Sequence, residues 1–87
     1  MQLSPEELDS VLKRLKRAQG QLGGIIRMIE EGRSCGDVVT QLAAVGKAID
    51  RAGFAVISTS LRGCMNVPEE QREVDVKQLE KLFLSLA

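Results

Sequence analysis

The residues of this chain best suited to chemistry are its two cysteines, Cys35 and Cys64, which stand at the two ends of one long apolar run. A thiolate is both a nucleophile and a soft metal ligand. If the run is one helix, the cysteines are about 43 Å apart at 1.5 Å per residue, whereas a disulfide needs Cα atoms within about 7 Å. The two thiols therefore cannot meet within one chain.

Two copies of the chain can bring the thiols together. In an antiparallel dimer the start of one helix lies beside the end of the other, so Cys35 approaches Cys64 of the partner subunit, twice by symmetry. The alternative is that each cysteine is a small buried hydrophobe at a helix end. Arg33, Arg62 and the position of Cys35 near a helix N-terminus favour the reactive thiolate instead.

A second candidate site is the basic segment KRLKR at 13–17, which places four cations within five residues of a chain with formal net charge zero. With Leu12 and Leu15 facing the core, these cations are expected to be exposed and able to contact DNA phosphates. The alternative is an ordinary solvated helix face. No short helix-turn-helix is visible, so DNA would bind the helical surface. The candidate DNA-binding residues are Lys13, Arg14, Lys16, Arg17, Lys47 and Arg51.

The elements that must position these residues are three predicted helices, at about 5–31, 35–62 and 74–86, in a single all-α domain spanning 1–87. Apolar residues recur at spacings of three, four and seven in each helix, and no strand-like alternation interrupts them. The turn between the first two helices is only a few residues long, so these helices are expected to form an antiparallel hairpin.

Caps and small residues add detail to this prediction. Ser4 and Glu7 form a capping box that begins the first helix, and Ser34 caps the second. Small residues flank the apolar stripe of the second helix and permit close packing on more than one face. A domain of 87 residues buries a smaller fraction of the surface that its unfolded chain exposes than a larger domain does, so association of two chains is expected to add stability. The hairpins of the two chains are then expected to form a four-helix bundle.

Composition excludes several classes of protein. The chain is 44% apolar but only 2% aromatic, as in helical bundles, and it contains no histidine. No signal peptide or membrane-spanning run is visible, so a cytoplasmic protein without membrane contact is expected. An enzyme is disfavoured, because no phosphate-binding loop, metal-ligand set or C-x-x-C pair is present. No cofactor is predicted.

The segment RLKRAQGQLGGIIRMIEEGRSCGDVVTQLAAVGKAIDRAG, with LRGC downstream, resembles the CsoR/RcnR/FrmR family of bacterial repressors. The resemblance covers nearly the whole chain. It implies an all-α dimer of dimers, a homotetramer without a helix-turn-helix, whose ligand-free form binds double-stranded operator DNA. Members of the family sense copper, nickel or cobalt, formaldehyde and sulfane sulfur.

Departures from the family pattern narrow the effector that the resemblance implies. Copper sensors place a histidine where this chain has Ser60, nickel and cobalt sensors need several histidines, and formaldehyde sensors have a proline where this chain has Gln2. Paired thiols with no third soft ligand beyond Met65 resemble the sulfane-sulfur sensors, in which persulfides bridge subunits as di-, tri- or tetrasulfides. The alternatives are two-coordinate Cu(I) on Cys35 and Cys64, or a helical oligomerisation module that binds no DNA.

Overall fold

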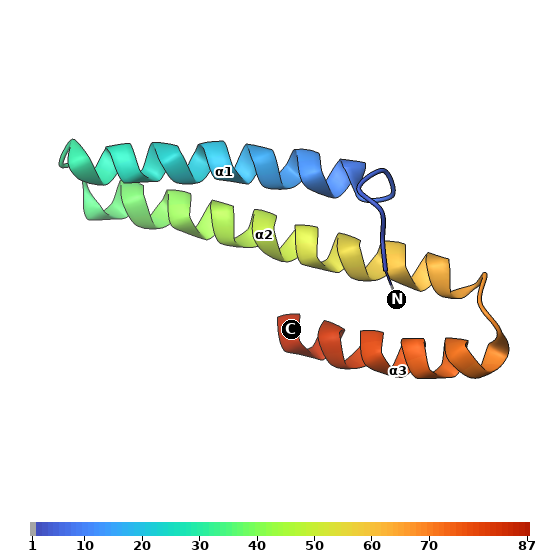
Figure 1. Ribbon diagram of the computed structural model, residues 1–87. Coiled ribbons are helices and arrows are strands. Elements are labelled where there is room, and N and C mark those ends of the chain that lie inside the picture. The colour runs from blue at the N-terminus through green and yellow to red at the C-terminus, as the bar shows by residue number, and fades with distance from the viewer. Residues whose placement is uncertain (1) are drawn as a thin grey trace.

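The computed structural model describes residues 2–87, which form three α-helices and no strand. Helix α1 spans Asp9–Glu30, α2 spans Cys35–Cys64 and α3 spans Glu69–Leu86. Helices α1 and α2 lie side by side as an antiparallel hairpin, and α3 folds back along the C-terminal half of α2 (Figure 1). The all-α prediction with three helices and a long hairpin is confirmed.

The turn between α1 and α2 is fixed by a glycine in the left-handed conformation. Gly32 has φ 75°, its N–H donates to the Ile29 carbonyl (3.1 Å), and the Arg33 N–H donates to the Met28 carbonyl (2.9 Å). This pair of hydrogen bonds is the Schellman arrangement that closes a helix C-terminus. The Ser34 hydroxyl then accepts the N–H of Asp37 (3.3 Å) and begins α2 as predicted. Cys35 is consequently the first residue of α2.

Helix α1 begins four residues later than predicted, although the predicted capping box forms. The Ser4 N–H and hydroxyl donate to Glu7 Oε1 at 3.2 and 3.1 Å, and the Glu7 N–H donates to Ser4 Oγ at 3.3 Å. The Leu8 N–H then donates to the Ser4 carbonyl four residues back, and the Asp9 N–H donates to the Glu6 carbonyl only three residues back, both at 3.3 Å. The three-residue bond makes residues 5–8 a turn, and the regular helix follows it.

The other two boundaries also differ from those predicted. Helix α2 continues two residues past 62 to Cys64, because Gly63 stays helical, and α3 begins at Glu69 instead of at about 74. Pro68 stands directly before α3, and its carbonyl accepts the Arg72 N–H at 2.9 Å. Acidic residues in the first turn suit the positive end of the helix dipole. The polar segment EEQREVD is therefore helical.

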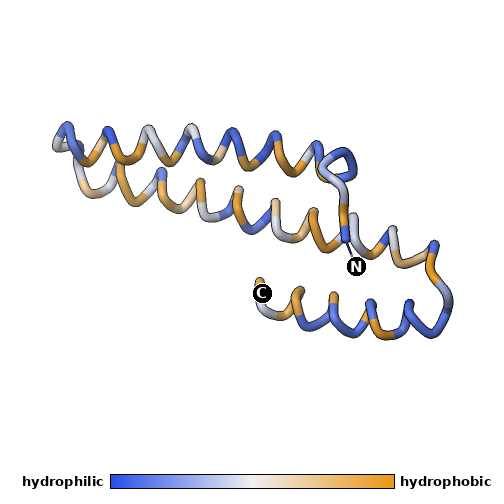
Figure 2. The backbone as a smooth tube through the Cα atoms, viewed as in Figure 1, coloured by the Kyte–Doolittle hydropathy of each residue, from blue (hydrophilic) through white to orange (hydrophobic). Residues whose placement is uncertain are grey.

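The core of the hairpin is one narrow stripe from each helix. Val11, Ala18 and Ile25 are buried on α1 at seven-residue spacing, and Val45 and Ala52 are buried on α2 at the same spacing. A seven-residue repeat keeps one seam facing the other helix along its whole length. Figure 2 shows hydrophobic and hydrophilic stretches alternating along both helices.

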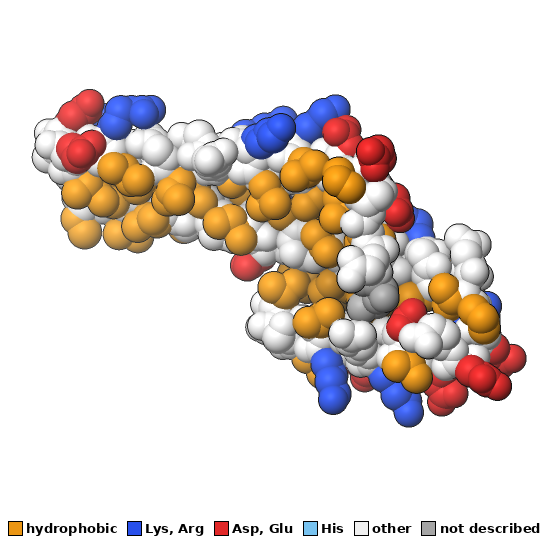
Figure 3. Space-filling view, viewed as in Figure 1, with side chains coloured by type: hydrophobic (Ala, Val, Ile, Leu, Met, Phe, Trp, Pro, Cys, Tyr) orange, Lys and Arg blue, Asp and Glu red, His pale blue; other side chains and the backbone are white. Residues whose placement is uncertain are grey.

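A second apolar stripe lies outside this core. Leu12 and Leu15, predicted to face the core, are 39% and 42% exposed. The physical reason is that a lone hairpin can bury only the stripe between its two helices, so these leucines can become core residues only in an assembly. We call the exposed stripe the apolar face; it consists of Leu12, Leu15, Leu22, Ile26, Ile29, Leu42 and Ile49. Figure 3 shows apolar side chains gathered along one side of the hairpin.

The chain is a flat, extended slab. Its principal extents are 55 × 25 × 12 Å and its radius of gyration is 16.9 Å, whereas a compact domain of this length has a radius of gyration of about 12 Å. Within residues 2–87, none of the helices combines the length and the apolarity that crossing a bilayer requires.

Candidate DNA-binding groove and thiol pair

Three arginines meet in a groove between α1 and α2. Arg14 and Arg17 come from α1, one turn apart, and Arg51 comes from the antiparallel α2. Two alanines of α2 contribute no bulk between them, which leaves a depression of about 260 Å³. The groove is lined by Arg14, Arg17, Gln21, Ala44, Ala48 and Arg51.

The groove is suited to a phosphate. Among the ion pairs of the described residues, none involves Arg14, Arg17 or Arg51, and all three residues are exposed. A guanidinium presents a planar fork of donors that matches two phosphate oxygens. Three such forks around one depression, with the amide of Gln21 beside them, can hold a backbone phosphate through several hydrogen bonds.

The remaining predicted DNA contacts lie outside the groove. Lys13 pairs with Asp9 at 3.1 Å on the exposed face of α1, and Lys16 and Lys47 are exposed but do not line the depression. Gln21 was not predicted, although it follows Arg17 by four residues and therefore shares its helix face. The structure thus gathers three of the six predicted cations and adds one amide.

The two cysteines stand at opposite ends of α2 but on one side of it. Cys35 is the first residue of α2 and Cys64 the last, 29 positions later, which is about eight full helical turns. Leu42 and Ile49 follow Cys35 at seven-residue steps, so both thiols share the side of α2 that carries the apolar face. The separation of about 43 Å along the helix excludes a link within one chain.

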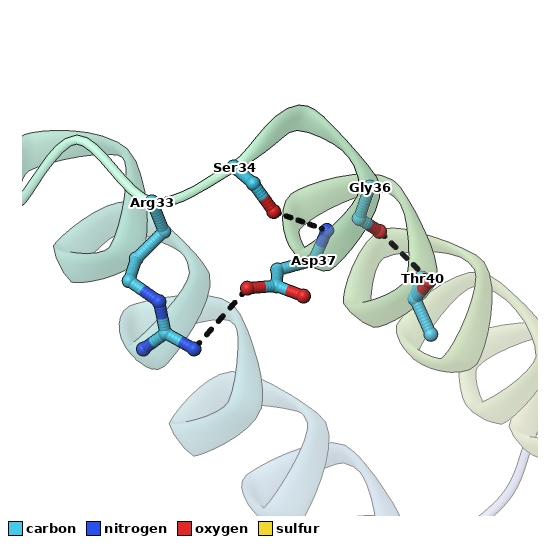
Figure 4. Close-up of polar contacts among 5 residues, drawn as sticks. All are labelled: Arg33, Ser34, Gly36, Asp37 and Thr40. Carbon is cyan, nitrogen blue, oxygen red and sulfur yellow. Dashed lines mark hydrogen bonds and ion pairs between the residues drawn. The ribbon is translucent and has the colours of Figure 1, made fainter.

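The surroundings of Cys35 differ from the prediction. Cys35 is exposed, but the Arg33 guanidinium is turned toward Asp37, with Nη2 3.4 Å from Oδ2 (Figure 4). The Thr40 hydroxyl bonds to the Gly36 carbonyl at 2.8 Å in the same turn. The Arg33 charge, which was predicted to favour the Cys35 thiolate, is therefore paired with the Asp37 carboxylate. Cys35 differs from Cys64 in being exposed, at the start of α2.

The surroundings of Cys64 are supplied by α3. Arg62, predicted to influence this thiol, places Nη2 3.4 Å from the Thr59 hydroxyl. Arg72 of α3 instead donates from Nε to the Cys64 carbonyl and from Nη2 to the Val67 carbonyl, both at 3.3 Å. One side chain thus closes the C-terminus of α2 and ties it to α3.

Cys64 also lines a cavity of about 420 Å³ between the N-terminal segment, the end of α2 and the start of α3. Cys64 is only 3% exposed, and Ser60 and Asp75 beside the cavity are buried as well. The Gln71 amide donates to Asp75 Oδ1 at 3.0 Å. Sequence reasoning did not single out Gln71 or Asp75, whose four-residue spacing on one helix was the available signal.

A soft metal ion would need ligands from two chains. Within residues 2–87 of one chain, no three histidine, cysteine, aspartate or glutamate side chains form a metal-binding group. If two chains paired antiparallel, Cys35 of one and Cys64 of the other would supply two thiolates, a donor set that suits the soft ion Cu(I). Ser60, one turn before Cys64, offers only a hydroxyl, so the donor set is two sulfur atoms.

Comparisons with known proteins point to one family. The family described as "Metal-sensitive transcriptional repressor" matches residues 7–85. The copper-sensing transcriptional repressor RicR of Mycobacterium tuberculosis is 40% identical over 60 residues, which are 69% of this chain and 62% of that protein. The copper-sensing transcriptional repressor CsoR of Mycobacterium ulcerans is 42% identical over 57 residues, 66% of this chain and 49% of that protein.

A third similar protein is closer in length to the matched segment. The uncharacterized protein YrkD of Bacillus subtilis is 46% identical over 59 residues, 68% of this chain and 92% of that protein. The copper-sensing proteins are longer, and the match spans only about half to three fifths of their length.

Proposed function

Since this chain belongs to the metal-sensitive transcriptional repressors, whose members are not enzymes, we propose that it binds operator DNA and releases it when its inter-subunit thiols are modified. The observation that carries the proposal is the convergence of Arg14, Arg17 and Arg51 from two helices on one groove. An ordinary solvated helix face has no reason to gather three arginines, none of which is in an ion pair within residues 2–87. Lys13, Lys16 and Lys47 extend the positive surface around the groove.

The apolar face supports assembly into an antiparallel dimer. It lies on the flank of the hairpin opposite to the arginine groove. On α1, the apolar face uses positions 12, 15, 22 and 26, which lie on one side of the Val11–Ile25 seam. The groove uses positions 14, 17 and 21, which lie on the other side. Two apolar faces packed together complete a four-helix bundle and leave both grooves open. Two such dimers form the proposed tetramer, which presents several grooves to one DNA duplex.

The proposed effector is a reactive sulfur species. The exposed Cys35 thiolate attacks the outer sulfur of a hydropersulfide, RS–SH; a new S–S bond forms, the old one breaks, and RS⁻ leaves with the electron pair. Cys64 of the partner subunit then attacks the inner sulfur of the Cys35 persulfide and displaces hydrogen sulfide, leaving a disulfide. The donor's sulfane sulfur is the oxidant. Further sulfur transfers before closure give tri- and tetrasulfide bridges.

The same helix couples the thiols to the groove. Helix α2 carries Cys35 and Cys64 at its ends and Arg51 between them. A bridge that draws the ends of two α2 helices together shifts Arg51 relative to Arg14 and Arg17 on α1. Couplings of this kind are typically about 1–3 kcal/mol, or about 5- to 150-fold in affinity.

Cu(I) is the second candidate effector, and the names of the similar proteins favour it, since RicR and CsoR are both copper-sensing repressors. In this case Cys35 and Cys64 of the partner subunit would hold the ion between two thiolates, and the resulting tie between the α2 ends would act on the groove as the sulfur bridge does. No histidine is present to complete a third ligand position.

The test is a DNA-binding titration over the promoter of the protein's own gene. Reduced protein is expected to bind a labelled promoter fragment in fluorescence anisotropy and to release it after treatment with glutathione persulfide or with Cu(I). Release by only one of these reagents identifies the effector class. If the reduced protein binds the promoter no better than a scrambled duplex, the repressor proposal fails and a helical oligomerisation module is favoured.

A further inference from the structure

We propose that Asp75 is a specificity-determining residue for the chemistry at Cys64: its buried carboxylate makes the cavity beside this thiol accessible to uncharged and cationic reagents and excludes anions. The inference rests on the proposed function in treating Cys64 as a sensing thiol. Its physical basis is the lining of one cavity, which α2 and α3 build together.

Because Cys64 is buried, the cavity is the route by which a reagent in solution reaches its thiol. With 3% of its surface exposed, Cys64 is reached from solvent through the 420 Å³ cavity that it lines. A small reagent that modifies Cys64 in the folded chain must therefore pass the other lining residues. Their charges decide which reagents arrive at a useful concentration.

The lining is acidic. Two carboxylates, Glu7 and Asp75, line the cavity, and none of the lining residues is a lysine or an arginine. Arg72 lies close by, with its guanidinium donating to the Cys64 and Val67 carbonyls, and its positive charge opposes that of Asp75. It does not belong to the lining, so Asp75 is the buried charge that a reagent meets inside the cavity. Among the ion pairs of residues 2–87, none involves Asp75 or Glu7.

Asp75 matters more than Glu7 because of its depth. Glu7 is exposed, and its Oε1 accepts two hydrogen bonds from Ser4, so solvent and salt screen its charge. Asp75 is only 5% exposed, and it accepts a hydrogen bond from the neutral amide of Gln71. A buried charge is screened less than an exposed one, and its potential extends over the cavity.

The Asp75 charge gives the two thiols different reaction partners. Hydropersulfides and polysulfides are largely anionic at neutral pH, so an anionic donor meets the exposed Cys35 first and is repelled from Cys64. Cys64 then reacts with the protonated, neutral form of the persulfide that the partner subunit's Cys35 carries, which brings no charge into the cavity. The same acidic lining attracts a cation such as Cu(I), which therefore has access to Cys64 from solvent.

The experiment compares two alkylating reagents of nearly equal size in the Cys35→Ser variant, in which Cys64 is the remaining thiol. The thiolate displaces iodide from both, but iodoacetate is an anion and iodoacetamide is neutral. The ratio of the iodoacetate rate to the iodoacetamide rate is expected to be about 5- to 30-fold lower in the folded protein than in urea, as one poorly screened charge at cavity distances predicts.

Two further variants isolate the charge. Asp75→Asn keeps the shape and is expected to raise the iodoacetate-to-iodoacetamide ratio at least threefold. Gln71→Lys, at an exposed position that lines the cavity, places a cation one turn from Asp75 and is expected to raise the ratio as well. Glu73→Gln removes an exposed carboxylate that lies outside the cavity and is expected to leave the ratio unchanged.

Equal acceleration of both reagents by Asp75→Asn would mean loosened packing and would overturn the inference. An unchanged ratio in both Asp75→Asn and Gln71→Lys would overturn it too. Neither result touches the repressor proposal, which depends on promoter binding and on release through Cys35 and Cys64. If the protein binds no DNA but shows the expected rate ratios, the inference about Asp75 stands and the repressor proposal fails.

Discussion

Phe54 of α2 and Phe83 of α3 pack against each other with ring centroids 5.3 Å apart and planes tilted by 55°. They are the only aromatic residues of the chain, and their geometry is the tilted arrangement that aromatic pairs prefer. Beside them Leu86 covers Gly53 so closely that a Cβ at this glycine would lie 2.9 Å from Leu86 Cδ1. These contacts hold α3 against α2.

The ring pair predicts a stability effect. Phe83→Ala is expected to lower the free energy of unfolding by about 1–2 kcal/mol, less than for a fully buried phenylalanine because Phe83 is 47% exposed. Urea unfolding followed by circular dichroism at fixed protein concentration measures it. Leu84→Ala, at a neighbouring position that is 64% exposed, is the control and should change the value by less than about 0.5 kcal/mol.

The arginine groove predicts a loss of DNA affinity. Arg17→Ala and Arg51→Ala are each expected to weaken promoter binding by about tenfold and to reduce the slope of log affinity against log salt concentration by about 0.9, the value for one lost phosphate contact. Anisotropy titrations at several salt concentrations give both numbers. Lys81→Ala removes an exposed cation on α3 and should leave both the affinity and the salt slope unchanged. Wild-type affinities and slopes in both arginine variants would mean that the groove does not contact DNA.

The placement of the cysteines predicts the topology of the crosslink. After treatment with polysulfide, non-reducing electrophoresis should show covalent dimer, and peptide mapping should join Cys35 of one chain to Cys64 of the other. Cys35→Ser should abolish both the crosslink and DNA release. Cys64→Ser should still accept a persulfide at Cys35 but should not form the bridge. A bridge mapped within a single chain would contradict the antiparallel dimer.

The apolar face predicts the oligomeric state. Ile49→Glu puts a charge in the proposed dimer interface and is expected to raise the dimer dissociation constant at least a hundredfold, measured by sedimentation. Ser58→Glu puts the same charge on an exposed position of the same helix, away from the apolar face, and should leave assembly intact. Equal behaviour of the two variants would place the interface elsewhere.

Local signals in the sequence were sufficient for the hairpin. Ser34 and Gly32 act on backbone groups within a few residues, and the structure forms the cap and the glycine turn that such residues favour. The start of α3 was missed, because residues 69–73 carry charge instead of an apolar stripe and hydrophobic periodicity gives no signal there.

Contacts between elements were harder to predict. The three-, four- and seven-residue spacing of apolar residues on α1 suggested a core that includes Leu12 and Leu15, but the buried seam is Val11–Ala18–Ile25, because a lone hairpin buries only the stripe between its two helices. Arg51 and Arg14 belong to different helices, and only the register of the hairpin brings them to one groove. Asp75 becomes a neighbour of the Cys64 cavity through the fold-back of α3, which sequence spacing does not encode.

The flatness of the chain has a consequence for the cell. A slab whose smallest extent is 12 Å is about one helix thick, so the apolar face has no covering layer within one chain. In the proposed dimer, a newly made chain without a partner leaves this face open, and we expect its survival against proteases to depend on the rate at which it meets a second chain. The proposed dimer thus links survival to concentration, because a larger fraction of chains is unpaired when the total concentration falls below the dimer dissociation constant.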